Sequence, residues 1–235
     1  MKAVFKREFR AYFQSPLAYV AIGAFFFVAA LLYTIGNLLI GDGDFVNILS
    51  NLTFALIAIV PILTMRIMSD DRKNGTEVLL VTSPTTTAEV VIGKYLAALC
   101  VFLIMVALST IFPMITMFYG TPSISAIISC YVGFILLGAS YIAIGVFASS
   151  LTENQIVSAL ITLVFFVFMF VIDALVAVIG GWFGTVLSWL SLLSRFSPFS
   201  LSVLSLTSIF YYLSFIAVFL FITIVSSDRR RWKSN

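Results

Sequence analysis

Few residues in this chain could do chemistry on a substrate. There is no histidine among its 235 residues, and the ten acidic residues form no cluster of the kind that metal sites or two-aspartate catalysis need. The two cysteines, Cys100 and Cys130, both lie in apolar stretches, which predicts small buried side chains and not a disulfide or a metal site. The sequence therefore argues against an intramembrane enzyme, and we predict no catalytic residue, metal or cofactor in the chain.

The usual motif for phosphate chemistry is also missing. The only Gly-Lys pair is Gly93-Lys94, which is followed by Tyr95 and lacks the rest of a phosphate-binding loop. We therefore do not expect this chain to hydrolyse ATP. What remains is a polar insert from Arg66 to Pro84, the one place where a soluble protein could dock on an otherwise apolar chain.

The composition of the rest of the chain predicts an integral membrane protein. Hydrophobic residues make up 62% of the chain and charged residues 10%, and the mean hydropathy of +1.16 is far outside the range of water-soluble domains. The net charge of +3 comes from short basic groups beside apolar stretches, where they set topology and meet lipid headgroups. Nucleic acid is therefore not expected as a partner.

Six apolar stretches can cross a bilayer, because a helix needs ~20 residues to span ~30 Å of hydrocarbon. Pro61 and Pro113 lie inside the second and third stretches, where we expect kinks. The predicted fold is an all-α integral membrane protein with six transmembrane helices, at Leu17–Ile40, Phe45–Met68, Tyr95–Tyr119, Ile124–Ala148, Ile156–Ile179 and Ser208–Val225.

Basic residues set the predicted orientation. With six spans both termini lie on one side, and twelve of the thirteen Lys and Arg residues then fall on that side. The positive-inside rule makes this the cytoplasmic side. Five or seven spans would instead place a group of four basic residues outside, so the charge pattern favours six.

The first sixteen residues predict an amphipathic helix that lies flat in the inner membrane interface, with aromatic side chains on one face and basic ones on the other. The alternative is a solvated basic leader with chance periodicity. The apolar run that follows is longer than a signal-peptide core and lacks a cleavage pattern, so we expect a retained first span after a bend at Pro16. The aromatic residues are Phe5, Phe9, Tyr12 and Phe13, and the basic residues are Lys6, Arg7 and Arg10.

Residues 180–207 are apolar but interrupted. The stretch from Trp182 to Leu193 would be ~18 Å long as a helix, which is too short to cross. We expect two short external re-entrant or interfacial helices, joined through Arg195 and punctuated by Gly180-Gly181 and Ser197-Pro198.

The loop of residues 69–94 carries two helix-start signals, Asn74 followed by Glu77 and Thr86 followed by Glu89. Between them we predict a short helix from Thr76 to Val81 whose apolar side chains would be exposed to water without a partner. The alternative is an ordinary cytoplasmic loop that packs on the chain's own helices.

Three polar side chains in or near the fifth span are candidates for the gate or pathway. Asp173 is the only acid deep in a span, and it either reaches headgroups or becomes protonated, or else makes a polar contact in the exit path. Glu153 and Gln155 stand at the inner start of the same span, where capping of the helix and a gate contact are both open.

The sequence resembles the permeases of ABC-2-type transporters, particularly their gliding-motility-like branch. The resemblance covers nearly the whole chain and is most specific at Arg72-Lys73-Asn74-Gly75-Thr76-Glu77-Val78-Leu79-Leu80-Val81-Thr82-Ser83-Pro84. Glu153-Asn154-Gln155-Ile156-Val157, Tyr211-Tyr212-Leu213-Ser214-Phe215 and Arg229-Arg230-Arg231-Trp232 are similar too. The chain departs from the pattern in residues 180–207, where Ser202 and the adjoining Leu206-Thr207-Ser208 stand in place of glycine and acidic residues.

The resemblance implies an exporter subunit of the bacterial inner membrane, driven by a separate ABC ATPase that binds ATP and Mg. It implies a second six-span permease subunit, identical or related, and a pathway lined by the first, second and fifth spans. The polar loop would be a coupling helix that contacts the ATPase; an ATP-independent secondary transporter or channel is the alternative. The domain limits are 1–16 for the interfacial helix, 17–225 for the six-span domain and 226–235 for a basic tail, and the implied coupling residues are Gly75, Thr76, Glu77, Val78, Leu79, Leu80, Ser83 and Pro84.

Overall fold

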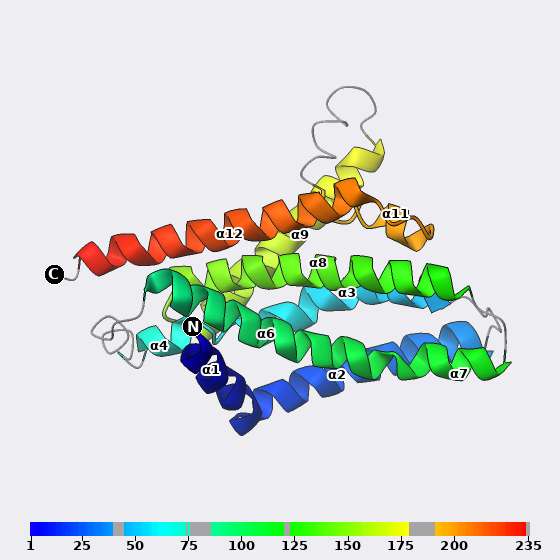
Figure 1. The fold of residues 1–235 in the computed structure, drawn as a ribbon, viewed down its shortest axis with the longest axis horizontal. Helices are drawn as coiled ribbons and strands as arrows, with labels where there is room; N and C mark the ends of the chain where they lie inside the picture. Colours follow the sequence, from blue (N-terminus) through cyan, green and yellow to red (C-terminus); the bar gives the residue numbers. More distant parts are fainter. Residues whose placement is uncertain (40–44, 74, 76–85, 120–122, 179–190, 234–235) are drawn as a thin grey trace.

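The computed structural model describes residues 1–39, 45–73, 75, 86–119, 123–178 and 191–233. Within these ranges the chain is helical and has no strand (Figure 1). The elements are α1 (Lys2–Gln14), α2 (Pro16–Tyr33), a π-helix (Thr34–Leu39), α3 (Phe45–Thr64), α4 (Ser69–Lys73), α6 (Thr87–Ser109), α7 (Ile111–Tyr119), α8 (Ile124–Leu151), α9 (Gln155–Val178), α11 (Ser197–Ser200) and α12 (Leu206–Lys233).

Six of these segments are long and apolar enough to cross a membrane, which confirms the predicted all-α, six-span fold. Helices are the expected solution because a helix satisfies its backbone hydrogen bonds internally, where lipid offers no partners. The spans run over Pro16–Leu39, Phe45–Lys73, Thr87–Phe118, Ile124–Leu151, Gln155–Val176 and Leu206–Asp228.

Several of the spans are longer than predicted, most clearly the third and the last. The third span begins at Thr87 and not at Tyr95, because the Thr86 hydroxyl caps the helix by accepting a hydrogen bond from the Glu89 amide at 3.3 Å. Lys94 is therefore a helical residue and not part of the loop. The last span likewise extends on both sides of the predicted Ser208–Val225.

The two prolines behave differently. Pro113 cannot donate a hydrogen bond to the carbonyl of Ser109, and the helix is interrupted at Thr110, between α6 and α7. Pro61 lies inside α3, which continues without interruption to Thr64. The sequence thus located the interruption near Pro113, and the kink at Pro61 stays a prediction.

The described part of the predicted re-entrant region, residues 191–207, has one short helix, α11. Ser197-Pro198 opens this helix, where the prediction had placed an interruption, because proline fits the first turn of a helix. Ser202 follows with a φ of 65°, a left-handed conformation that favours glycine. Most of the first predicted re-entrant segment, residues 180–190, lies outside the described residues.

The centre of the bundle is α8, which packs against α3, α6, α9, α11 and α12 and is the most buried of the six spans. Small residues let its neighbours approach closely. A Cβ atom at Gly138 would lie 2.2 Å from the ring of Phe102, and one at Gly145 would lie 2.2 Å from the hydroxyl of Thr64. Phe134 completes this core by packing against Phe25 and Phe102.

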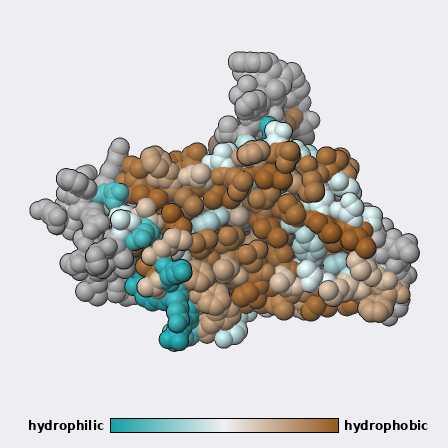
Figure 2. Space-filling view, viewed as in Figure 1, coloured by the Kyte–Doolittle hydropathy of each residue, from teal (hydrophilic) through white to brown (hydrophobic). Residues whose placement is uncertain are grey.

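Most of the lateral surface is apolar, as a lipid-facing surface should be. Figure 2 shows hydrophobic residues over most of one face, with hydrophilic residues gathered over α1. The start of α1, the C-terminal end of α12 and α4 all lie at the same end of the bundle (Figure 1). Polar groups are therefore concentrated at this end.

The close approach at Gly145 gives a test of the core. We expect Gly145→Ala to lower the free energy of unfolding by about 1–3 kcal/mol, because the added methyl group forces α3 away from α8. Gly23→Ala is the matched control, since nothing lies within 4 Å of its added Cβ and it should be neutral or slightly stabilising. Thermal unfolding in detergent measures both, and equal effects would contradict this packing.

Candidate functional site

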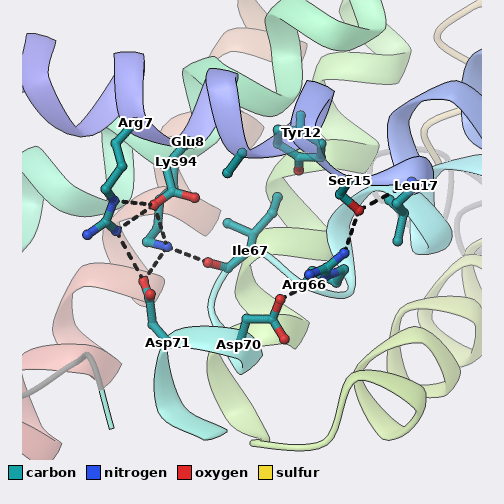
Figure 3. A pocket seen from close by; sticks show the side chains of 11 residues that line it. Arg7, Glu8, Tyr12, Ser15, Leu17, Arg66, Ile67, Asp70, Asp71 and Lys94 are labelled. Carbon is teal, nitrogen blue, oxygen red and sulfur yellow. Dashed lines mark hydrogen bonds and ion pairs between the residues drawn. The ribbon is translucent and has the colours of Figure 1, made fainter. Parts of the chain in front are cut away.

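A buried lysine organises the polar end of the bundle. Lys94, in the third turn of α6, has a side chain that is only 2% exposed. Its Nζ atom lies 2.5 Å from Asp71 Oδ2 and 3.2 Å from Glu8 Oε1, and it donates to the Ile67 carbonyl oxygen at 2.6 Å (Figure 3). The three N–H groups of the ammonium therefore have three acceptors, contributed by α1, α4 and the turn before α4.

Arg66 extends this arrangement toward the first span. Its Nε donates to Asp70 Oδ2 at 2.8 Å, and its Nη1 donates to Ser15 Oγ at 2.6 Å. Ser15 is also the N-cap of α2, because its hydroxyl accepts a hydrogen bond from the Leu17 amide at 3.3 Å. Arg66 therefore links the end of α3 to the bend at which α1 becomes α2.

Tyr12 attaches α1 to α3 at the same level. Its hydroxyl donates to the Leu63 carbonyl oxygen at 2.9 Å. Burial and, to a smaller extent, the charge of Glu8 hold the pKa of Tyr12 well above its ordinary value, although Arg66 acts in the opposite direction. Tyr12 is thus a neutral hydrogen-bond donor. We call this set the polar hub: Arg7, Glu8, Tyr12, Ser15, Arg66, Asp70, Asp71 and Lys94.

The break between α3 and α4 is held by Ser149 of α8. The Ser149 hydroxyl accepts hydrogen bonds from the amides of Met68 and Ser69, at 3.0 Å and 3.2 Å, and donates to the Met65 carbonyl oxygen at 3.3 Å. These bonds satisfy backbone groups that the end of α3 leaves without helical partners. The hub is therefore fixed to the central helix.

A pocket of roughly 290 Å³ lies within the hub, between α1 and the turn that leads to α4 (Figure 3). Its walls carry three basic and three acidic side chains, and its remaining surface is formed by Ala11, Tyr12, Ser15, Leu17 and Ile67. No group of three or more metal-ligating side chains occurs in the described ranges. The hub can therefore hold helices together and bind polar groups.

The predicted coupling residues start directly after α4. Gly75 is exposed and has a φ of 67°, which glycine adopts without strain. Thr76, Glu77, Val78, Leu79, Leu80, Ser83 and Pro84 lie outside the described residues, so their helix stays a prediction. The helices on both sides of this loop, α4 and α6, each provide a member of the hub, namely Asp71 and Lys94.

The N-terminal end of α9 separates the two roles, capping and a gate contact, that the sequence left open there. Asn154 caps the helix, because its Oδ1 accepts a hydrogen bond from the Ile156 amide at 2.9 Å. Gln155 instead reaches across to α4, where its Nε2 donates to Asp70 Oδ1. Glu153 is exposed beside them. Capping therefore belongs to Asn154, and Gln155 couples α9 to the hub.

Asp173 lies far from the hub, near the other end of α9. Its Oδ1 accepts a hydrogen bond from the hydroxyl of Ser191, a fully buried side chain that also contacts Ser194. Tyr212 of α12 donates to the Leu192 carbonyl oxygen at 2.7 Å. Asp173 and Tyr212 thus hold the segment before α11 against α9 and α12.

Sequence reasoning missed Glu8 and Lys94 as partners. Glu8 was unremarkable within a basic leader, and Lys94 was counted as a loop residue. A signal was present, since Glu8 is the only acid before Asp42, and Lys94 lies between Val90-Val91-Ile92 and Tyr95-Leu96. An ionisable residue in an apolar helix indicates a buried partner.

Comparison with protein families finds one matching model, described as ABC-2 family transporter protein, over residues 17–227. The match spans the six membrane-crossing helices, whereas α1 precedes it. No curated protein matches the sequence.

The hub predicts a charge-specific effect at Lys94. We expect Lys94→Met to lower the free energy of unfolding by about 3 kcal/mol, because Glu8 and Asp71 lose their buried cation and keep the more exposed Arg7 as their ion-pair partner. The triple variant with Glu8→Gln and Asp71→Asn should recover most of this loss. Lys73→Met, at an exposed position of α4, is the control and should have little effect. Thermal unfolding of the four proteins measures these changes. If the triple variant is as unstable as Lys94→Met alone, this role of the charge is contradicted.

Proposed function

The chain belongs to the ABC-2 transporter family, and from this premise we propose that it is the permease subunit of an exporter driven by ATP hydrolysis on a separate subunit. It is a multi-pass membrane protein with six apolar helices, and membrane proteins of this family work with ATPase subunits. The finer assignments are ours: an ABC ATPase that holds ATP and Mg, a second permease subunit, and a bacterial inner membrane with both termini cytoplasmic.

The observation that carries this proposal is the position of the hub at both ends of the coupling loop. Residues 74–86 connect α4 to α6, and Asp71 at one end is paired with Lys94 at the other. A force on the loop would reach α1 and α2 through Glu8 and Ser15. It would reach α9 through the contact of Asp70 with Gln155. The loop is thus joined to several helices and not to one.

This connection fits a two-state transporter. A partner can shift the equilibrium between two arrangements of the bundle only by contacts that differ between them. An ATPase that closes on ATP and grips the loop would supply such contacts, and rigid polar links would transmit the displacement. The chain lacks a phosphate loop of its own, so the ATP chemistry is assigned to the partner.

The proposed pathway runs along α2, α3 and α9. In sequence these are the first, second and fifth spans, and α3 contacts both of the others. Although α3 is largely buried, it leaves one continuous exposed stripe, whose members are Asn47, Asn51, Phe54, Ala58 and Ile62. Their spacing of three or four residues places them on one helical face. Phe54 packs edge-on against Phe170 of α9, which puts this stripe beside the exposed face of α9.

The chemistry of this face supports an uncharged amphipathic cargo. Among the described residues of α2, α3 and α9, the only ionisable side chain other than tyrosine is Asp173, and its carboxylate is hydrogen-bonded to Ser191. The exposed stripe offers two amides and then apolar side chains. A cargo with a hydrogen-bonding head and an apolar body would leave no charge unpaired on such a surface.

The coupling role predicts loss of transport without loss of insertion. We expect Leu79→Asp and Glu77→Arg each to reduce ATP-dependent transport at least about tenfold, equal to ~1.4 kcal/mol of lost coupling, because they disrupt the contact with the ATPase. Ser123→Asp is the control, since it adds a charge at the opposite end of the bundle at an N-cap position where Asp is favoured. Unchanged transport in both loop variants would remove the coupling assignment, and transport by the purified chain without an ATPase would remove the proposal itself.

The pathway predicts a position-specific steric effect. Ala58→Trp should abolish most of the ATP hydrolysis that uncharged amphiphiles stimulate in the reconstituted complex, because the indole would fill the stripe on α3. Ala217→Trp is the matched control, because Ala217 is also an exposed alanine but lies on α12, and it should change this stimulation little. Equal responses of the two variants would contradict the assignment of the pathway to α3.

A further inference from the structure

The pocket within the polar hub has the features of a ligand site that the coupling role does not require. We propose that it binds the headgroup of a phosphatidylethanolamine molecule from the adjoining leaflet, with the phosphate on Arg66 and the primary amine on the neighbouring carboxylates. This inference concerns lipid binding by the chain itself and does not depend on ATP, cargo or a partner.

The pocket lies where a headgroup would be. Its wall includes Ser15 and Leu17, which stand at the bend where α1 ends and the 24-residue apolar span begins. The end of a membrane-spanning helix lies at the level of the lipid headgroups. α1 forms one side of the pocket, and its exposed basic residues, Lys2, Lys6 and Arg10, suit the same anionic phosphate layer.

Arg66 retains the hydrogen-bonding capacity that a phosphate needs. A guanidinium has five N–H groups, and within the described residues Arg66 directs one to Asp70 and one to Ser15. Its side chain is 39% exposed and lines the pocket, so the others remain available there. Lys94 is different, because its three N–H groups are directed at Glu8, Asp71 and Ile67. Arg66, which lies beside Ser15 at the start of the first span, is thus a cation that can bind a phosphate.

The charge balance of the pocket selects a zwitterionic headgroup. The lining contains Arg7, Arg66 and Lys94 against Glu8, Asp70 and Asp71, so its formal charge is zero. An anionic headgroup would bring a net negative charge among three carboxylates, whereas a phosphate joined to an ammonium brings none. A primary ammonium can donate hydrogen bonds to carboxylates, which the quaternary group of choline cannot do. At roughly 290 Å³ the pocket is near the lower limit of small-molecule sites and suits a headgroup better than a larger ligand.

Native mass spectrometry of the full chain, released from nanodiscs made of one lipid each, tests the proposal. Retention of phosphatidylethanolamine should exceed that of phosphatidylcholine and phosphatidylglycerol by about tenfold or more, a difference that a few charge-assisted hydrogen bonds can supply. Arg66→Gln should remove this preference. Ala11→Phe should also remove it by filling the pocket, and it leaves every charged residue of the hub in place at an exposed position of α1.

Two controls, the Lys2→Gln variant and inorganic phosphate, keep the result specific. Lys2→Gln removes an exposed cation of α1 that does not line the pocket, and it should retain the preference. Equal retention of all three lipids, or a preference that survives both Arg66→Gln and Ala11→Phe, would overturn the proposal. Inorganic phosphate that raises the unfolding temperature as much as phosphatidylethanolamine does would reassign the site to free phosphate and overturn the lipid source. Because none of these measurements uses nucleotide or cargo, the lipid-binding proposal can fail while the transport proposal stands, and the reverse.

Discussion

One buried positive charge constrains the polar end of this protein. Lys94 lies on an otherwise apolar stretch of α6, and a charge removed from water is tolerated only with partners of opposite charge. Those partners come from α1, which is far from Lys94 along the chain, and from α4, which precedes the loop of residues 74–86. Satisfying this one ammonium therefore fixes α1, α4 and the start of α6 relative to one another.

The polar hub also connects helices from both halves of the sequence that a transporter must move together. The hub reaches α2 through Ser15 and α9 through Gln155, while Ser149 of α8 holds the break that precedes α4. At the opposite end, Asp173 and Tyr212 hold the segment before α11 to α9 and α12. Among the described residues, the charged side chains thus gather at the two ends of the spans, where several of them join helices to one another.

The sequence predicted what depends on local composition and periodicity. Six spans, the helix that follows Thr86, and the break near Pro113 follow from hydropathy, capping chemistry and the missing amide of proline, so each was found without knowledge of the neighbours. The resemblance to the ABC-2 family also came from the sequence and is confirmed over residues 17–227. Its gliding-motility branch and the helix at Thr76–Val81 stay predictions.

Other features depend on which helices meet, and here the sequence was insufficient. Hydropathy alone placed Lys94 outside the predicted third span. Its burial depends on the carboxylates of Glu8 and Asp71, which belong to other helices and cannot be inferred from the sequence around Lys94. Likewise, spans this uniformly apolar have no periodicity that separates inside from outside, and only the packing of α3 against α2, α8 and α9 leaves the stripe from Asn47 to Ile62 exposed. The sequence by itself determined that the chain crosses a membrane six times. The tertiary structure decided which polar groups pair with one another and which face of α3 stays exposed, because both depend on contacts between helices.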